Sequence, residues 1–214
     1  MNSLDKIFCY SLYKYLRIYL ELLYGYFLYE TNVMGSNNIE KLIITAQELI
    51  DDSFKLGIKV IESGYEPTTI VTLWRGGATV GIVIDELMSY KKIITNHNVL
   101  KTSSYKNTEQ LSSVKIFGLE GTLDRLGKKE KILIIDDIFD SGNTIDAVIN
   151  ALNEKHSYVI KEIRIAVPWF KPENNKTLIS PDYYLHETNK WIVFPHELES
   201  LSEDEIIKYR SGII

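Results

Sequence analysis

The sequence has little cysteine and no excess of positive charge. Cys9 is the only cysteine among 214 residues, which excludes a disulfide framework and a thiolate metal site within the chain and favours a reducing, cytoplasmic compartment. The formal net charge of -5 argues against a general affinity for nucleic acid. The histidines show no metal-ligand spacing, and we predict that they are surface or loop residues; they are His97, His156, His186 and His196.

The sequence also lacks internal repeats and low-complexity runs. Its composition, 45% hydrophobic and 25% charged, suits one globular domain with an appendage. A chain of this length can bury a sizeable core. We therefore expect residues 1–34 to form an N-terminal apolar helical extension and residues 35–214 to form a single domain.

An apolar stretch at residues 7–29 distinguishes the extension. A narrow polar stripe crosses it at helical spacing, formed by Ser11, Lys14, Arg17 and Glu21. The stretch could span a bilayer by length, but its mid-segment charges argue against this, and no cleavage site of a signal peptide follows. Three interpretations stay open. We favour a helix packed on the body or on a second subunit over a membrane-surface helix, and over an upstream extension absent from the natural product, which would start near Met34.

The most informative stretch runs from a strand into a helix. Ile132–Ile135 form an unbroken aliphatic run, typical of a strand buried on both faces. Asp136 and Asp137 follow, then a Gly-containing turn at residues 140–143 and an apolar-periodic helix at 145–152. Free N–H groups at the turn and the helix start attract an anion, whereas the carboxylates attract a metal ion or a pair of hydroxyls. A sugar phosphate chelated by a divalent cation meets both requirements.

A second unit of the same kind carries a fixed cation. Residues 69–73 predict a buried strand, Trp74-Arg75-Gly76-Gly77 a turn, and residues 80–88 a helix. Paired glycines let the backbone approach a ligand closely, and an arginine offers planar donors to phosphate oxygens.

The remaining segments complete an α/β pattern. Apolar periodicity predicts a helix over residues 39–61, with its cap among residues 35–38, and a short helix over 202–210. Further strands are expected at 93–100, 114–118 and 163–167. The alternation of strands and helices predicts a mostly parallel twisted sheet with helices on both faces and a ligand at the carboxyl ends of its strands.

The stretch from Ile132 to Thr144 resembles the signature for 5-phosphoribosyl-1-diphosphate (PRPP) of the type I phosphoribosyltransferases, with Phe139 where an aliphatic residue is usual. The resemblance implies that fold, with a small C-terminal hood. It also implies that Asp136 and Asp137 bind the ribose hydroxyls and Mg²⁺, and that Asp140 is the general base. The residues that it assigns to PRPP are Trp74, Arg75, Gly76, Asp136, Asp137, Asp140, Ser141, Gly142, Asn143 and Thr144.

Two further features carry the same resemblance. That family often has a non-proline cis peptide in its diphosphate loop, here expected between Trp74 and Arg75. Ser103, Ser104 and Tyr105 resemble the flexible loop that closes over the active site, although an ordinary polar hairpin loop is the alternative.

The C-terminal part of the chain, around Trp191 and Ile192, resembles the 6-oxopurine subgroup of that family, particularly its bacterial xanthine-guanine and archaeal members. By that resemblance Trp191 stacks on the purine, the Ile192 backbone meets the exocyclic edge, and Lys171 donates to the 6-oxo group. The alternatives are a core aromatic for Trp191 and a solvated side chain for Lys171. The implied reaction joins hypoxanthine, guanine or xanthine to PRPP with Mg²⁺, in a homodimer or homotetramer.

Rival functions fit the residues less well. A non-catalytic PRPP-binding regulator of the same fold is the main alternative, and the presence of Asp140 argues against it. A receiver-like domain is disfavoured because Ser-Gly-x-Thr follows the acidic pair late in the chain. A P-loop nucleotidase fits less well still, because G-x-x-x-x-G-K-[ST] does not occur.

Overall fold

The computed structural model describes residues 40–105, 113–124, 126–127, 129–199 and 201–210. The expectations for residues 1–34, and for the apolar stretch 7–29 within them, lie outside the described residues and stay predictions. The domain boundary after residue 34 stays a prediction for the same reason. Within the described ranges, no helix is both long enough and apolar enough to cross a membrane.

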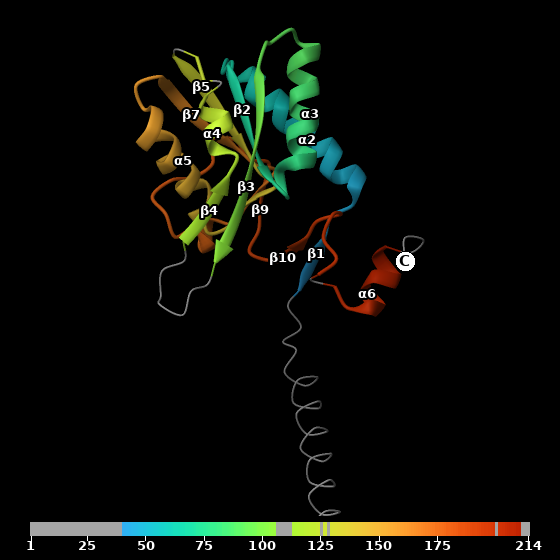
Figure 1. The fold of residues 1–214 in the computed structure, drawn as a ribbon. Coiled ribbons are helices and arrows are strands. Elements are labelled where there is room, and N and C mark those ends of the chain that lie inside the picture. Colours follow the sequence, from blue (N-terminus) through green and yellow to red (C-terminus); the bar gives the residue numbers. More distant parts are fainter. Residues whose placement is uncertain (1–39, 106–112, 125, 128, 200, 211–214) are drawn as a thin grey trace, which may run out of the picture. The chain divides into compact units, whose positions relative to one another are not determined.

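A central sheet organises the described residues, in which it has five strands in the order β4-β3-β2-β5-β7 (Figure 1). Neighbouring strands run parallel, except that β3 and β4 are antiparallel. The strands are β2 (Thr69–Trp74), β3 (Asn96–Tyr105), β4 (Ser113–Phe117), β5 (Glu130–Ile135) and β7 (Ile160–Ala166). The predicted mostly parallel sheet is confirmed.

Helices cover both faces of this sheet, which Figure 1 shows. On one face lie α2 (Ala46–Glu62) and α3 (Gly77–Tyr90), and their apolar residues share a cluster with the sheet. On the other face lie α4 (Leu119–Leu123) and α5 (Asn143–His156), which share a second cluster. Such two-sided cover is what parallel strands require.

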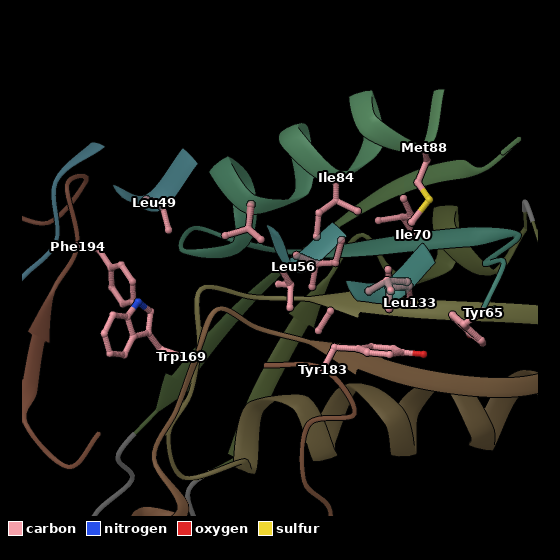
Figure 2. Packing of buried hydrophobic residues seen from close by; sticks show 14 of the residues in the cluster. Leu49, Leu56, Tyr65, Ile70, Ile84, Met88, Leu133, Trp169, Tyr183 and Phe194 are labelled. Atoms are coloured by element: carbon pink, nitrogen blue, oxygen red, sulfur yellow. The ribbon is translucent and has the colours of Figure 1, made fainter. Parts of the chain in front are cut away.

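The aliphatic run of β5 explains this arrangement. Ile132–Ile135 are all fully buried. Alternate side chains of a strand point to opposite faces, so the run contributes to both clusters. Figure 2 shows Leu133 in the first cluster, together with Ile70 of β2 and with Ile84 and Met88 of α3.

The beginning of the fold differs from the helix that we predicted over residues 39–61. α2 begins at Ala46, and the residues before it form β1 (Lys41–Ile43), which pairs in parallel with β10 (Trp191–Val193). Apolar residues here suit either a helix or a strand, and pairing with a distant segment selects the strand. The prediction was wrong for residues 41–45.

α2 begins at a capping box, later than the cap that we predicted among residues 35–38. The Thr45 hydroxyl accepts a hydrogen bond from the Glu48 N–H (3.2 Å), and the Glu48 carboxylate accepts one from the Thr45 N–H (2.8 Å). These reciprocal bonds satisfy N–H groups that the first helical turn leaves unpaired.

β3 extends further than expected. Ser103, Ser104 and Tyr105 are its last residues and pair with β4, so the expectation that they lie in a loop was wrong. The antiparallel pairing with the return strand continues to Tyr105, and this long-range pairing outweighs the polar composition. The return strand predicted at 114–118 is confirmed as β4. Residues 106–112, between the two strands, lie outside the described residues.

Residues 168–210, which we call the hood, meet the end of the sheet that carries the acidic pair. β8 (Trp169–Phe170) pairs in parallel with β6 (Ile138–Phe139), just after that pair, and with β9 (His186–Glu187). The hood also contains the 3₁₀ helix η1 (Pro172–Asn174), β10, and α6 (Glu203–Tyr209), close to the helix predicted at 202–210.

Candidate active site

The turns that follow β2 and β5 are in direct contact. The two strands are paired neighbours, so their carboxyl ends meet at one edge of the sheet. A Cβ atom on Gly76 would lie 2.3 Å from Oδ2 of Asp137, and one on Gly77 would lie 2.6 Å from the Ile135 carbonyl oxygen. Only glycine fits at these positions. The Arg-Gly-Gly turn and the acidic pair therefore lie together at the carboxyl ends of β2 and β5.

The peptide bond between Trp74 and Arg75 is cis, which confirms the expectation. Both residues line a cavity of about 490 Å³, together with Asp136, Asp137 and Thr144. This cavity brings the predicted diphosphate loop, the acidic pair and the start of α5 around one volume.

Four residues that the sequence did not single out as site residues also line this cavity. Lys101 and Thr102 come from β3, and His196 and Glu197 come from the hood. Lys101 adds a second cation to that of Arg75. The sequence signal that could have identified Lys101 was its place near the end of a predicted strand. His196 and Glu197 carried no such signal, because only the folded hood brings them to the acidic pair. Ser103, from the predicted loop, is not among the described residues that line this cavity.

The acidic pair is electrostatically strained. Asp137 is only 6% exposed, and the shielding of the Asp136 carboxyl group from water raises its pKa well above the ordinary value. The neighbouring charge of Asp137 raises the pKa of Asp136 further, whereas backbone N–H groups, including that of Asp137 at 3.0 Å, oppose the shift. A cation or a hydrogen-bond donor that enters this site relieves the strain.

The turn after β6 forms a smaller cavity at the start of α5. This cavity of about 150 Å³ is lined by Asp140, Ser141, Gly142 and Thr144, among others. Gly142 has a φ of 79°, and a Cβ atom there would lie 2.6 Å from Oγ1 of Thr177, so the turn needs glycine on both counts. Unpaired N–H groups and the helix dipole make such a cavity suitable for an anion.

The base-binding candidates gather beside Asp140. Lys171 is 5% exposed, and its Nζ lies 3.6 Å from Oδ2 of Asp140 and 5.7 Å from the centre of the Trp191 ring. Asn174, which the sequence analysis did not single out, donates from Nδ2 to Oδ1 of Asp140 (2.8 Å). Trp191 is 47% exposed, so it is no core aromatic, and Lys171 is no solvated lysine.

A second cavity, of about 570 Å³, adjoins the Trp191 side chain. Among the described residues, its lining also includes Arg75, His196, Glu197, Leu198 and Glu199. Ile192, next in β10, is 5% exposed and does not line this cavity with its side chain. The two large cavities share Arg75, His196 and Glu197, so they meet at these residues.

The acidic pair suits Mg²⁺ by its donor chemistry. Among the described residues, no group of three or more histidine, cysteine, aspartate or glutamate side chains is arranged to hold a metal ion. Mg²⁺ is commonly held by one or two carboxylates together with substrate oxygens, and Asp136 and Asp137 can supply that share.

Comparison with known proteins identifies the family. Residues 43–203 match the family model described as a phosphoribosyl transferase domain. A xanthine-guanine phosphoribosyltransferase of Nitratidesulfovibrio vulgaris (strain DP4) is 30% identical over 159 residues, which are 73% of this chain and 84% of the relative. The chain belongs to the phosphoribosyltransferase family.

Solved structures agree with this assignment. The phosphoribosyltransferase resembles the purine phosphoribosyltransferase from Pyrococcus horikoshii Ot3 with a TM-score of 0.59 at 29% identity, over 76% of this chain and 98% of that one. The Helicobacter pylori xanthine-guanine-hypoxanthine phosphoribosyltransferase gives 0.55 at 25% identity, over 72% and 92%. The expected family, fold and enzyme class are confirmed. Enzymes of this family generally use PRPP with Mg²⁺.

Proposed function

We propose that the phosphoribosyltransferase joins a 6-oxopurine base to PRPP, giving a nucleoside 5′-monophosphate and diphosphate in purine salvage. The observation that carries this proposal is the buried ammonium group of Lys171 between Asp140 and Trp191. A buried cation favours a carbonyl oxygen over an amino group, so it selects a 6-oxopurine against adenine. The half-exposed Trp191 ring offers a face on which a flat base can stack, and the Ile192 backbone would meet its exocyclic edge.

The PRPP half of the proposal rests on the larger cavity and the turn cavity. Asp136 and Asp137 would accept hydrogen bonds from the ribose hydroxyls. The 5′-phosphate would occupy the turn cavity, held by N–H groups and hydroxyls of residues 140–144. Each interaction of an anion with a helix start contributes about 0.3–1 kcal/mol when exposed, and more when partly buried. Arg75, aided by Lys101, would bind the diphosphate together with the backbone of Trp74 and Gly76.

Mg²⁺, when held by Asp136 and Asp137, supplies positive charge that offsets the charge of the diphosphate. The residues of this chain account for the other requirements. Arg75 stabilises the diphosphate as it leaves.

The reaction itself needs a base at the purine. The purine N9 forms a bond to C1 of the ribose, the bond from C1 to the diphosphate oxygen breaks, and diphosphate leaves with the electron pair. Asp140 accepts the proton from N7. Asn174 and Lys171 contact its two oxygens and orient the carboxylate towards the base.

The assembly that we propose is a homodimer or homotetramer. Large apolar side chains on α3 and on the neighbouring β3–β4 surface are exposed: Ile82 (69%), Val99 (52%) and Phe117 (52%). Lys101 pairs with Phe117 across β3 and β4, and Asp85 of α3 lies 3.4 Å from His97 of β3, so these side chains belong to adjoining elements. Exposed apolar side chains on adjoining elements can together form an association surface.

A base-selectivity assay tests the proposed reaction. Hypoxanthine, guanine, xanthine and adenine are each supplied with PRPP and Mg²⁺, and the nucleotide product is quantified by chromatography. We expect turnover with at least one 6-oxopurine and much less with adenine. Preferred turnover of adenine, or none with any base, would overturn the proposal; the latter would instead support the regulatory alternative if PRPP still bound.

A further inference from the structure

His196 lies where the two large cavities of the candidate site meet. It lines the larger cavity, which contains the acidic pair, and also the cavity beside Trp191. Its Nε2 lies 3.3 Å from Oδ2 of Asp137, and the side chains of the two residues are 25% and 8% exposed. A residue of the hood thus contacts the acidic pair at the end of β5.

Asp137 is confined between this histidine and the diphosphate loop. A Cβ atom on Gly76 would lie within 2.3–2.4 Å of all three carboxyl atoms of Asp137, so the carboxyl group packs against the loop backbone. A carboxylate buried to this degree requires a donor. Nε2 of His196, 3.3 Å from Oδ2, is close enough to offer one.

The imidazole is itself held in place by the core. Its ring stacks on that of Phe194, with centroids 5.7 Å apart and planes 7° apart. Phe194 is 2% exposed, and Figure 2 shows it at the same end of the buried cluster as Trp169 and Leu49. The Phe194 carbonyl accepts a hydrogen bond from Arg210 (3.0 Å), and its N–H donates to Glu197 (3.2 Å). His196 therefore follows a rigid segment and has little freedom to turn away.

We propose that His196 is a positioning residue that holds the Asp137 carboxylate in the orientation in which it accepts a ribose hydroxyl of PRPP. This inference rests on the proposed function, in which Asp137 binds the sugar. Without the donor at Nε2, the Asp137 carboxylate turns away from the sugar, and the neighbouring Gly76 loop loses a packing partner. PRPP binding should weaken, while the contacts of the base with Lys171 and Trp191 remain.

The test compares two substitutions that separate packing from donation. His196→Phe keeps an aromatic ring on Phe194 but removes the donor, and His196→Gln restores an N–H at similar reach. We expect His196→Phe to raise the KM for PRPP at least about tenfold, the lower end of the effect of losing a donor to a charged group, with the KM for the base within about twofold. His196→Gln should recover most of the loss. A similar rise in both KM values, or no recovery in His196→Gln, would overturn the proposal.

His186 provides a matched control in the same hood. It also contacts an aspartate, with Nε2 2.8 Å from Oδ2 of Asp52, and stacks on Trp169 at 4.4 Å between centroids, but it lines neither large cavity. His186→Phe should lower the melting temperature and leave the KM for PRPP unchanged. An equal rise in that KM would show that any damage to the hood has this effect and would refute a specific role for His196.

Calorimetry with PRPP and Mg²⁺ in the absence of base makes the two proposals separable. If wild type binds PRPP but turns over no 6-oxopurine, the proposed reaction fails, and the ratio of PRPP dissociation constants for His196→Phe and His196→Gln still decides the role of His196. If His196→Phe does not fold, His196→Ala takes its place against His196→Gln. Equal dissociation constants for the two variants contradict the proposal.

Discussion

The side chain of Asp140 illustrates how a single residue is oriented for the role of general base that we propose for it. Each of its carboxylate oxygens has a partner, Asn174 at 2.8 Å on one side and Lys171 at 3.6 Å on the other. Both partners come from the hood, whereas Asp140 follows β6. A carboxylate oriented by two donors loses little freedom when the base arrives, which is the condition for efficient proton transfer.

Asp140→Asn should leave PRPP binding close to that of wild type and reduce kcat by about 10²–10⁴-fold, the usual share of a general base. The amide keeps the size of the side chain and still accepts from Asn174, but it cannot take the proton from N7. Steady-state kinetics with a 6-oxopurine measures kcat, and calorimetry measures PRPP binding. Unchanged turnover would remove Asp140 from the mechanism.

Asp136 predicts a pH dependence of stability. Its pKa in the folded protein lies above the ordinary value of 3.8, because the carboxyl group is shielded from water next to Asp137. Between these two values the folded protein binds more protons than the unfolded chain, so its stability falls as the pH rises through this interval.

Asp136→Asn removes that decline. In thermal unfolding without PRPP or metal, the melting temperature of the variant relative to wild type should therefore increase from about pH 4 to about pH 7. Asp124→Asn, at an exposed position after α4, serves as the control and should show no such trend. A difference that stays constant with pH would contradict the cause given for the raised pKa.

At the scale of elements, the site depends on how closely two turns approach each other. The paired strands β2 and β5 bring the Arg-Gly-Gly turn onto the acidic pair, and the space left there suits a hydrogen atom only. The sequence signals for both turns were strong because each combines a buried strand, glycine and a helix start. Their mutual contact follows from strand order, which the motifs alone do not determine.

Gly76→Ala should abolish measurable PRPP binding while the protein still folds. The added methyl group would lie 2.3–2.4 Å from the Asp137 carboxyl atoms, so that side chain must leave its place. Gly121→Ala, in α4, is the matched control, since a Cβ there meets nothing within 4 Å. It should retain PRPP binding and increase stability by about 0.4–1 kcal/mol. Calorimetry and chemical denaturation measure the two effects, and equal binding by both variants would contradict the packing argument.

Thr45→Ala tests the capping box that begins α2. Loss of the reciprocal bonds between Thr45 and Glu48 should lower the free energy of unfolding by about 1 kcal/mol, within the usual range for an N-cap. Gln47→Ala, in the same turn, removes only an exposed hydrogen bond to Asp51 and should change stability by less than about 0.5 kcal/mol. Urea denaturation measures the free energy of unfolding of both variants. Equal losses of stability would contradict the capping role of Thr45.

For the whole molecule, local periodicity predicted the central sheet and its main helices, but not the pairings between distant segments. Ile132–Ile135 identified the central strand because burial on both faces leaves a continuous apolar run. Residues 41–43 were misassigned because their partner, β10, lies near the other end of the chain. Lys101 and His196 escaped notice as site residues for a related reason: each reaches the cavity only through tertiary structure, although both lie close in sequence to residues that carry the family resemblance.

The exposed apolar side chains of α3 and β3–β4 lead to a prediction for the assembly. Wild type should have a mass in solution of at least twice the 24.7 kDa of one chain, and Ile82→Lys should shift it towards a single chain. Ile207→Lys is the control, because Ile207 of α6 is similarly exposed (67% against 69%) but lies in the hood. Light scattering checks both, and a wild type of single-chain mass, or equal effects of the two variants, would contradict the proposed interface.

The pairing of β1 with β10 affects the order in which the enzyme becomes competent during synthesis. Lys41 is among the first described residues to leave the ribosome, but its partner Trp191 emerges after every strand of the central sheet is already available. A nascent chain can therefore assemble its sheet and the turns after β2 and β5 before β1 has its partner. On the proposed function, the platform for the purine and His196 should therefore be among the last parts of the site to form.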